Sequence, residues 1–230
     1  EFAERPRFTT PEIQRSSLAA VILRMKALGL DSIEQFPFIE PPPGKAIADG
    51  YQLLTELGAV DDRNALTPLG RELARLPLDP RIGRMILEAR NREALTEVLI
   101  IAAALSVQDP RERPAEAQQA ADEAHRKFSD ERSEFLGWLK LWAHYHAAIA
   151  HKKSQRKLWG ELRGQYLSPL RLREWHDVHS QLHTLVAEQG WRLNTTEATY
   201  EQIHCALLSG LLGNVGYKGD DDAQYLGARG

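Results

Sequence analysis

The chain has 230 residues, of which 43% are hydrophobic and 27% are charged, so it is long enough and apolar enough to bury a sizeable core. Its formal net charge of −3 excludes a global positive field for nucleic acid, so any such contact has to be local. The single cysteine, Cys205, excludes an internal disulfide, and no apolar run or basic leader points to a membrane. We therefore expect a cytoplasmic protein with no membrane partner and, because the sequence starts without Met, a piece of a longer one.

The first periodic segment predicts a helix from Pro11 to Leu28 that stops at Gly29, a residue suited to the left-handed end of a helix. Its apolar residues recur at helical spacing: Ile13, Leu18, Val21, Ile22, Met25 and Leu28. Prolines between 36 and 43 then favour extended backbone, because proline disfavours a helical residue before it. This part predicts a linker and the first domain boundary.

The next part predicts two short helices joined by a turn. The first has apolar residues at helical spacing from Ile47 to Leu57 and stops at Gly58. The second starts at Thr67-Pro68, where a capping hydroxyl precedes a proline that is tolerated at the first helical position.

Two further helices follow, and the second of them is apolar on nearly every side. Asp79-Pro80 repeats the start signal, and an apolar stripe follows it. Residues 95–105 are almost all apolar, which predicts a buried helix with other helices packed around it. Asp109-Pro110 ends this segment.

After residue 114 the sequence predicts a bundle of longer helices. Apolar stripes at helical spacing run through 135–149, 158–166 and 172–186. Short turns between these stripes favour antiparallel packing. The expected fold class is therefore mainly α.

The end of the chain predicts one more helix and then two strands. Asn194-Thr195-Thr196 indicates a helix start, and Cys205 is expected on that helix as a small buried residue. Beyond Gly213 the residues alternate as in strands, at Val215–Tyr217 and again at Tyr225–Leu226, so a C-terminal hairpin is predicted.

Several blocks of the sequence, taken in order, resemble DEAH-box RNA helicases, most closely the bacterial HrpA-type subfamily. These blocks are PEIQRSSLAAVILRMKALGL with FPFIEPPP, GKAIADGYQLLTELGAV, LTPLGRELARLPLDPRIGRMIL and LSVQDPRERP. The resemblance implies the end of the second RecA-like motor domain at 1–40, a winged-helix domain at 41–110, a helical ratchet domain at 111–209 and a truncated OB-fold at 210–230. The winged helix would need a small hairpin that the sequence does not make evident, and the helix before Gly29 would pack on the motor or on the winged helix.

The resemblance also implies a function. The parent protein would couple ATP hydrolysis, with Mg²⁺, to 3′-to-5′ movement along RNA. Its partners would be single-stranded RNA and the motor domains of the same polypeptide. The piece described by this sequence would hold no cofactor of its own and would be inactive alone.

Two motifs that suggest nucleotide chemistry are discounted by their context. Asp122-Glu123-Ala124-His125 spells DEAH, but an alanine-rich helical segment precedes it, whereas a motor needs this acidic pair at the end of a buried strand. Gly44-Lys45 is followed by Ala46, which lacks the hydroxyl that a phosphate-binding loop places on the metal ion. We expect neither catalytic residues nor ATP hydrolysis in this polypeptide.

A histidine face is the one candidate for metal. His176, His179 and His183 share one side of a predicted helix, and the last two have the spacing of a zinc pair. Ser180 stands where metalloproteases carry glutamate, and no third carboxylate or cysteine ligand is evident. A plain helix face is therefore favoured, and no metal site is predicted.

The strongest functional signal is a basic strip at 151–173. This stretch contains seven lysines and arginines and only one acidic residue, with aromatic residues between them. Cations neutralise phosphates and aromatic rings stack on unpaired bases, so the strip predicts a single-strand RNA surface. The candidate residues are Lys152, Lys153, Arg156, Lys157, Trp159, Arg163, Tyr166, Ser168, Arg171 and Arg173, together with Arg111 and Arg113. Ser168-Pro169 stands where the resembling family often has Asn followed by an aromatic residue.

Other interpretations of these residues stay open. The cations could be simply solvated, Trp159 and Tyr166 could belong to the core, and Arg111 and Arg113 could pair with the acidic helix behind them. A helical scaffold that binds protein partners, with no nucleic-acid role, is the alternative function. The cations favour RNA if they line one groove with the winged helix, and the scaffold if they point to unrelated sides.

Overall fold

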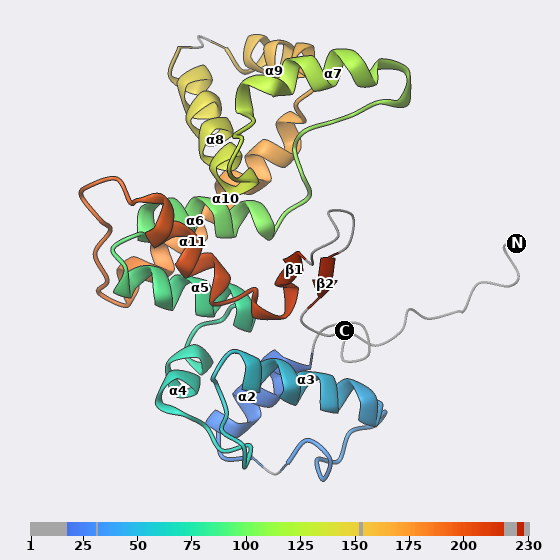
Figure 1. Ribbon diagram of the computed structural model, residues 1–230, viewed down its shortest axis with the longest axis vertical. Coiled ribbons are helices and arrows are strands. Elements are labelled where there is room, and N and C mark those ends of the chain that lie inside the picture. The colour runs from blue at the N-terminus through green and yellow to red at the C-terminus, as the bar shows by residue number, and fades with distance from the viewer. Residues whose placement is uncertain (1–17, 31, 152–153, 219–224, 228–230) are drawn as a thin grey trace, which may run out of the picture. The chain divides into compact units, whose positions relative to one another are not determined.

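The computed structural model describes residues 18–30, 32–151, 154–218 and 225–227, which form a mainly α structure (Figure 1). The helices are α2 (Ala19–Ala27), α3 (Gly44–Glu56), α4 (Pro68–Ala74), α5 (Pro80–Asn91), α6 (Leu95–Leu105), α7 (Gln118–His125), α8 (Glu134–His151), α9 (Gln155–Gly164), α10 (Pro169–Glu188) and α11 (Tyr200–Leu208). Single 3₁₀ turns lie at Ala115–Ala117, Arg126–Phe128 and Leu212–Asn214. The expected fold class is confirmed.

The chain divides into two compact units. Unit 1 comprises residues 1–88 and 207–230, and unit 2 comprises residues 89–206. Across the described part of the chain, none of the helices combines the length and the apolar character that spanning a membrane requires. The four domain boundaries that the resemblance implied stay a prediction.

In unit 1, α2 packs on α3 and α4, so the first apolar stripe finds its partner in the winged-helix segment. The approach is close, because a Cβ added to Gly50 of α3 would lie 2.8 Å from Ile22 Cδ1. Helix α2 ends at Ala27, and Gly29 terminates it as predicted, with φ +67° and a hydrogen bond of 3.0 Å from Leu30 N–H to the Met25 carbonyl. The predicted start of this helix at Pro11 lies outside the described residues. The prediction that Leu28 belongs to the apolar face was wrong, because Leu28 lies beyond the final turn of the helix and is 67% exposed.

The predicted cap of α4 also organises the turn before it. The Thr67 hydroxyl accepts from Gly70 N–H at 2.9 Å and donates to the Gly58 carbonyl at 2.7 Å. The hairpin that the sequence did not make evident is reduced to one antiparallel bridge, Val60 to Leu66. Asp61 holds the turn between them by accepting backbone N–H groups, among them that of Ala65 at 2.8 Å.

The C-terminal hairpin is present, as predicted. Strand β1 (Gly216–Lys218) pairs antiparallel with β2 (Tyr225–Gly227), and Tyr217 lies opposite Leu226. The turn between the strands falls outside the described residues. Whether this hairpin begins an OB-fold stays a prediction.

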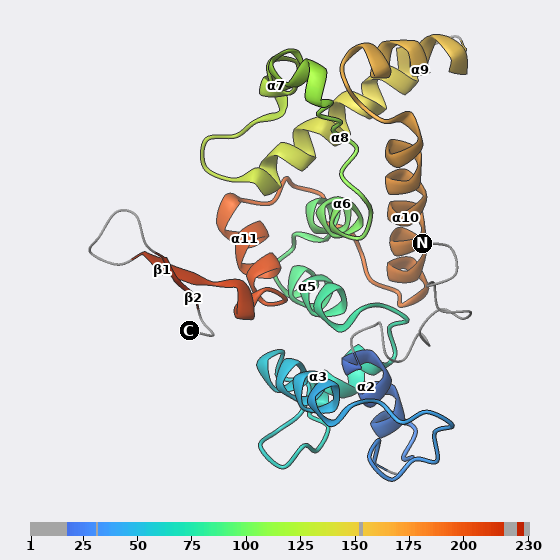
Figure 2. The same cartoon turned by 90° about the vertical axis from the view of Figure 1, so that its right-hand side faces the viewer.

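Unit 2 is built around α6, the helix predicted to be buried. It packs against both α8 and α10, and Figures 1 and 2 show it beside α10 and below α8. Trp175 of α10 is fully buried, and its ring N–H donates to the Ile100 carbonyl at 2.9 Å. Trp138 of α8 meets Trp175 edge-on, with ring centroids 5.5 Å apart. These contacts give the bundle one shared core.

The start of α6 is held by a residue from the other end of the unit. Asn194 accepts from Thr96 N–H at 2.8 Å and donates to the Glu97 carboxylate at 2.9 Å. The second oxygen of Glu97 accepts from Ala198 N–H at 3.0 Å, so this carboxylate is satisfied although only 8% exposed. Asn194 therefore acts as a cap for a helix about a hundred residues away in sequence.

The predicted start of the last helix was correspondingly wrong. Helix α11 begins at Tyr200, after a capping box in which Thr199 N–H donates to the Gln202 side chain at 2.8 Å and Gln202 N–H donates to the Thr199 hydroxyl at 3.3 Å. The earlier Asn-Thr-Thr run was the same kind of signal, but tertiary contacts use it elsewhere. Cys205 lies on α11, as predicted, but is only half-buried.

Candidate nucleic-acid interface

Two loops of unit 2 that lie far apart in sequence pair with each other. Glu112 N–H donates to the Tyr166 carbonyl and Ser168 N–H to the Pro110 carbonyl, each at 2.8 Å, around an antiparallel bridge between Arg111 and Leu167. The tertiary structure thus brings several candidate residues together at one place. We call segments 109–113 and 166–168, together with Arg171 from the first turn of α10, the paired loops.

Arg111 is bound on several sides within the paired loops. Its guanidinium makes a two-pronged contact with Asp109, with distances of 2.7 to 3.1 Å, and donates to Glu134 at 2.8 Å. It also lies 4.5 Å from the centre of the Trp138 ring. Burial alone would lower the pKa of Arg111. The hydrogen bonds that Arg111 donates to Asp109 and Glu134 outweigh burial, so the pKa is raised. The charge of Arg111 is therefore used by the fold.

Arg113 and Arg171 are also engaged by oxygen atoms of the chain. Arg113 binds both oxygens of Asp122 on α7, each at 2.7 Å, and these hydrogen bonds lower the pKa of that carboxyl. Arg171 donates to the Asp109 carbonyl at 3.0 Å. The alternative interpretation, a salt bridge to the acidic helix that follows, holds for Arg113, whose partner Asp122 lies on α7. Arg111 pairs instead with Asp109 and with Glu134 of α8.

The remaining candidates of the paired loops, Tyr166 and Ser168, contribute mainly through their backbone. Tyr166 adopts φ +55°, a left-handed conformation that non-glycine residues rarely take, and its carbonyl lies 3.1 Å from His125 Nε2. Ser168 is 8% exposed and precedes the first residue of α10. Both residues position the loop, and neither presents a free side chain on the scale of the α9 cations.

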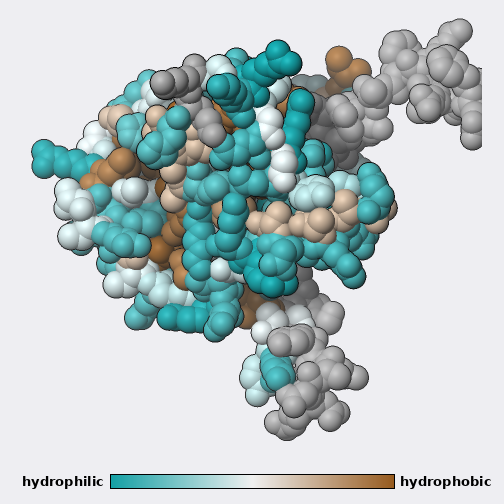
Figure 3. Space-filling view, turned by 90° about the horizontal axis from the view of Figure 1, so that it is seen from above, coloured by the Kyte–Doolittle hydropathy of each residue, from teal (hydrophilic) through white to brown (hydrophobic). Residues whose placement is uncertain are grey.

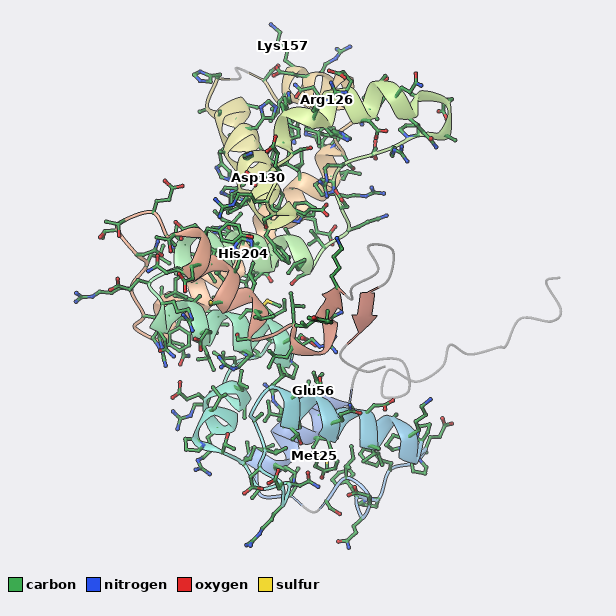
Figure 4. All side chains as sticks on the ribbon, in the orientation of Figure 1. Met25, Glu56, Arg126, Asp130, Lys157 and His204 are labelled. Carbon is green, nitrogen blue, oxygen red and sulfur yellow. The ribbon has the colours of Figure 1, made fainter. Side chains whose placement is uncertain are left out.

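Helix α9 presents a different kind of surface. Its N-cap is Ser154, whose hydroxyl accepts from Lys157 N–H at 3.4 Å. Arg156 and Lys157 are exposed, and within the described residues neither makes an ion pair. Figure 4 shows Lys157 pointing away from the unit at the end that carries α9. Lys152 and Lys153 lie outside the described residues.

The aromatic residue of this helix lies partly under a cation. Arg163 is exposed, and its guanidinium carbon is 5.6 Å from the centre of the half-buried Trp159 ring. Trp159 and Arg173 also line a cavity of about 320 Å³ between α8, α9 and α10. Seen from above in Figure 3, the end of unit 2 that carries α7 and α9 is covered mainly by hydrophilic residues. We call Arg156, Lys157, Trp159 and Arg163 the α9 face.

Two cations at the same end of unit 2 were missed by the sequence reasoning. Arg126 follows α7 and is exposed, with Glu123 at 2.6 Å, and Figure 4 shows it at the end that carries Lys157. Lys127 donates to the Gln165 side chain at 2.6 Å, next to Tyr166. A count of charge along 151–173 could not find them, because only the packing of α7 beside the paired loops brings them near.

The two discounted motifs lie on helices. The DEAH tetrapeptide ends α7, with Asp122 and Glu123 exposed, whereas a motor would need these residues at the end of a buried strand.

Among the described residues no group of three or more His, Cys, Asp or Glu side chains could hold a metal ion. His176 and His179 instead surround Trp142 of α8, with ring centroids 6.0 and 4.6 Å from its own.

Burial of this histidine cluster has an electrostatic consequence. Burial, with smaller contributions from His183, His176 and His146, lowers the pKa of His179 to about 4. Burial likewise lowers the pKa of His146, whose Nε2 has no hydrogen-bond partner in the described structure. His146 and His179 are thus packed in their neutral form.

Comparison with known proteins decides the family. Residues 51–78 match the winged-helix model of the helicase-associated domain (HA2), and residues 79–157 match its ratchet-like model. The chain is 48% identical over its whole length to the ATP-dependent RNA helicase HrpA homolog of Haemophilus influenzae and 49% identical to the ATP-dependent RNA helicase HrpA of Escherichia coli. Residues 51–157 therefore form the winged-helix and ratchet-like parts of an HA2 domain. The chain is homologous to the HA2 region of DEAH-box RNA helicases, as the sequence resemblance predicted.

This HA2 region is only a part of those relatives. It covers 18% of each of the two bacterial helicases. The DExH-box ATP-dependent RNA helicase DExH1 of Arabidopsis thaliana is 33% identical over 91% of this chain, which covers 22% of that relative.

The boundary between the two HA2 models, at 78/79, lies at the start of α5. The ratchet-like match begins at Asp79, whose carboxylate accepts from Arg81 N–H at 2.9 Å at the start of α5. It therefore includes α5 and α6, whereas the boundary that we predicted from resemblance lies at 110/111. Because α6 packs on α8 and α10, the packing groups it with the ratchet helices.

Proposed function

We propose that this HA2 region supplies an RNA-binding surface to an ATP-dependent DEAH-box RNA helicase, and that the α9 face carries it. The observation that supports this is the exposure of Arg156 and Lys157, with Arg163 over Trp159 on the same helix. Unpaired cations can exchange their water and counterions for phosphates, and the ring beside them can stack on a base. Single-stranded RNA is the proposed ligand.

The paired loops contribute by positioning. Arg111 ties the loop before α7 to Glu134 of α8, and Arg171 of α10 ties the same loop to α10. Helix α9 leads directly into the segment before α10. A face held in place by such contacts loses little conformational freedom on binding, which favours affinity. In this proposal the half-buried, paired cations hold the surface and the exposed cations bind the strand.

In this proposal the ATP-hydrolysing motor domains lie elsewhere in the parent polypeptide. No Gly-Lys-Ser/Thr sequence occurs in this chain, so the motor domains of the same polypeptide would bind ATP and Mg²⁺ and drive 3′-to-5′ movement. The HA2 region would hold several nucleotides while the motor domains open and close. The hairpin of β1 and β2 would open an OB-fold, and the parent would act in the cytoplasm.

The test is a binding titration with the 230-residue chain. Fluorescence anisotropy of a labelled single-stranded RNA should report binding at low salt that weakens as salt is raised, because each neutralised phosphate releases counterions. A duplex RNA of the same length is the comparison ligand. Absence of binding at low salt, or binding indifferent to salt, would count against the proposal.

A second candidate, protein docking, is favoured by a different surface. The segment after α2 in unit 1 exposes four large apolar side chains, and Ile39 is fully exposed. These residues are Leu28, Leu30, Phe36 and Ile39. Exposed apolar patches mark protein contacts, and the motor domains of the same polypeptide are the proposed partner. Replacing Leu28 and Ile39 by serine should weaken binding to a separately made motor fragment and leave RNA binding by the 230-residue chain unchanged.

A further inference from the structure

The cavity beside the α9 face has walls from three helices of unit 2. Helix α8 contributes Tyr145, α9 contributes Trp159, and α10 contributes Arg173 and Asp177. Its volume of about 320 Å³ is larger than a single planar ring needs. The α9 cations lie on the same helix as its aromatic wall, so a strand bound to them would pass its mouth.

Arg173 and Asp177, the charged side chains of this cavity, are not held by a hydrogen bond to each other. The Asp177 carboxylate lies within ion-pair distance of Arg173, at 3.9 Å, and of His176, at 3.8 Å, but both separations are too long for a hydrogen bond. Arg173 and Asp177 are both more than half exposed, so neither is held in a buried pair. Within the described residues the cavity therefore offers an acceptor and a donor beside an aromatic ring.

Tyr145 adds a hydroxyl to the same wall. Burial raises the pKa of Tyr145, and the neighbouring Asp177 raises it further, so the hydroxyl keeps its proton at neutral pH. No hydrogen bond of this hydroxyl is found among the described residues. It is a second group that could contact a polar ring edge.

We propose that this cavity takes up an unpaired nucleobase that carries an exocyclic amino group, from an RNA strand whose phosphates lie on Arg156 and Lys157. This inference rests on the proposed function of the α9 face and extends it to base preference. Trp159 would stack on the base, and the Asp177 carboxylate would accept from the amino group. Uracil has no amino group, so it would leave Asp177 without a donor and bind less well.

A protein side chain is the other conceivable occupant, and the observations favour the base. Arg173 lines the cavity, and Arg156 and Lys157 are exposed on α9, the helix that supplies its aromatic wall. This charge pattern suits a polyanion. An apolar side chain would leave the acceptor Asp177 and the donor Arg173 unmatched. A planar base with donors at its edge matches both the ring and the carboxylate.

The experiment compares two oligonucleotides that differ only in the base. Oligocytidine and oligouridine of equal length carry the same phosphates and the same ring size, so the α9 cations bind them equally. Anisotropy with the 230-residue chain should show tighter binding of oligocytidine, by about threefold for an exposed hydrogen bond to a charged group. Asp177→Asn should abolish this preference, because the amide can rotate either to accept from the amino group of cytosine or to donate to the carbonyl of uracil. Glu174→Gln, an equal charge change on α10 outside the cavity, should keep the preference.

Stacking is tested separately. Trp159→Ala should weaken binding of both oligonucleotides by about fivefold or more, because a base loses its stacking partner. The matched control is Trp191→Ala, since Trp191 is also half-buried, lies under Arg90 at 4.6 Å, and does not line the cavity. If Trp159→Ala reduces the stability of the chain, the Asp177→Asn comparison decides alone, because Asp177 is exposed.

The outcomes separate this inference from the proposed function. Equal binding of the two oligonucleotides with normal salt dependence overturns the cavity assignment and leaves the α9 face standing. A preference that survives Asp177→Asn also overturns it. Lack of any salt-dependent RNA binding overturns both proposals. Loss of motor-fragment binding in Trp159→Ala, with RNA binding intact, assigns the cavity to a protein partner and overturns the inference.

Discussion

The paired loops and the α9 face contain the same kinds of residue and use them in opposite ways. In the paired loops each arginine meets oxygen atoms of the chain, and Arg111 alone contacts Asp109, Glu134 and the Trp138 ring. On α9, Arg156 and Lys157 extend into solvent. The difference teaches that the number of cations in a stretch does not measure the charge available to a ligand. The acidic and carbonyl groups that tertiary packing brings near each cation decide it.

The largest expected effect belongs to the most engaged cation. Arg111→Ala should lower the free energy of unfolding by about 2 kcal/mol, because Asp109 and Glu134 lose their partner and Trp138 loses packing. Urea denaturation followed by tryptophan fluorescence measures this. Arg111→Lys, which keeps the charge but not the two-pronged geometry, should recover only part of the loss. An unchanged midpoint for Arg111→Ala would show that the paired loops do not depend on this residue.

The α9 face should respond in binding and not in stability. Arg156→Gln with Lys157→Gln should weaken single-stranded RNA binding about tenfold at low salt and reduce the salt slope by about 1.4, for two phosphate contacts. The free energy of unfolding should change by less than about 0.5 kcal/mol. Anisotropy over a salt series measures the slope.

The control for that pair carries the same change in net charge. Arg63 and Arg75 are exposed in unit 1, and replacing both by glutamine removes two positive charges from the other unit. If this control weakens RNA binding as much as the α9 variant does, the effect comes from net charge and the distinction between the two regions fails.

A pH series also tests the comparison, because arginine and lysine do not titrate below neutral pH, whereas burial lowers the pKa of His179 into that range. The pKa of His179 is about 4 in the folded chain and near 6.5 when unfolded, so the unfolded chain binds the proton first. Stability from this group is complete above about pH 6.5 and is lost as the pH falls toward 4. With a discount for partial exposure, the loss should be about 1 kcal/mol.

Denaturation midpoints at several pH values measure this loss. The variant His179→Gln should have a flatter profile between neutral pH and pH 4 than the natural chain. RNA binding at fixed salt should follow folding over this range and show no separate transition from α9. Parallel pH profiles for the variant and the natural chain would remove His179 as the cause.

The smallest effect is expected at Arg113, the exposed member of the paired loops. Arg113→Gln breaks the contact with Asp122, but exposed ion pairs are screened by water, so the denaturation midpoint should stay unchanged within error. RNA affinity should change by less than about twofold. A loss as large as that of the α9 variant would move Arg113 from the structural group to the binding group.

Local patterns predicted most of the helices, because the signals they use are local. Thr67 and Asp79 cap the helices that follow them, Gly29 and Gly58 take the left-handed conformation at helix ends, and α6 is buried on nearly all sides. These outcomes need only a few neighbouring residues. The resemblance, which rests on longer blocks, supplied the family.

The failures came where a local signal has two possible uses. Asn194-Thr195-Thr196 has the composition of a helix start, yet Asn194 caps α6 while Thr199 caps α11. No local rule distinguishes these, since the partner of Asn194 lies about a hundred residues away. Leu28 continued the apolar stripe but passed the last turn of its helix, where no partner covers it within the described residues.

By itself, the sequence determined the family, the helical character and the places where most helices begin and end, because periodicity and capping act over one or two turns. Only the tertiary structure decided which cations are engaged and which are available. That choice depends on oxygen atoms and rings from distant segments, such as Glu134 and Trp138 around Arg111. The strength of a charge contact falls with distance and with water between the groups, so it is set by packing in space and not by order along the chain.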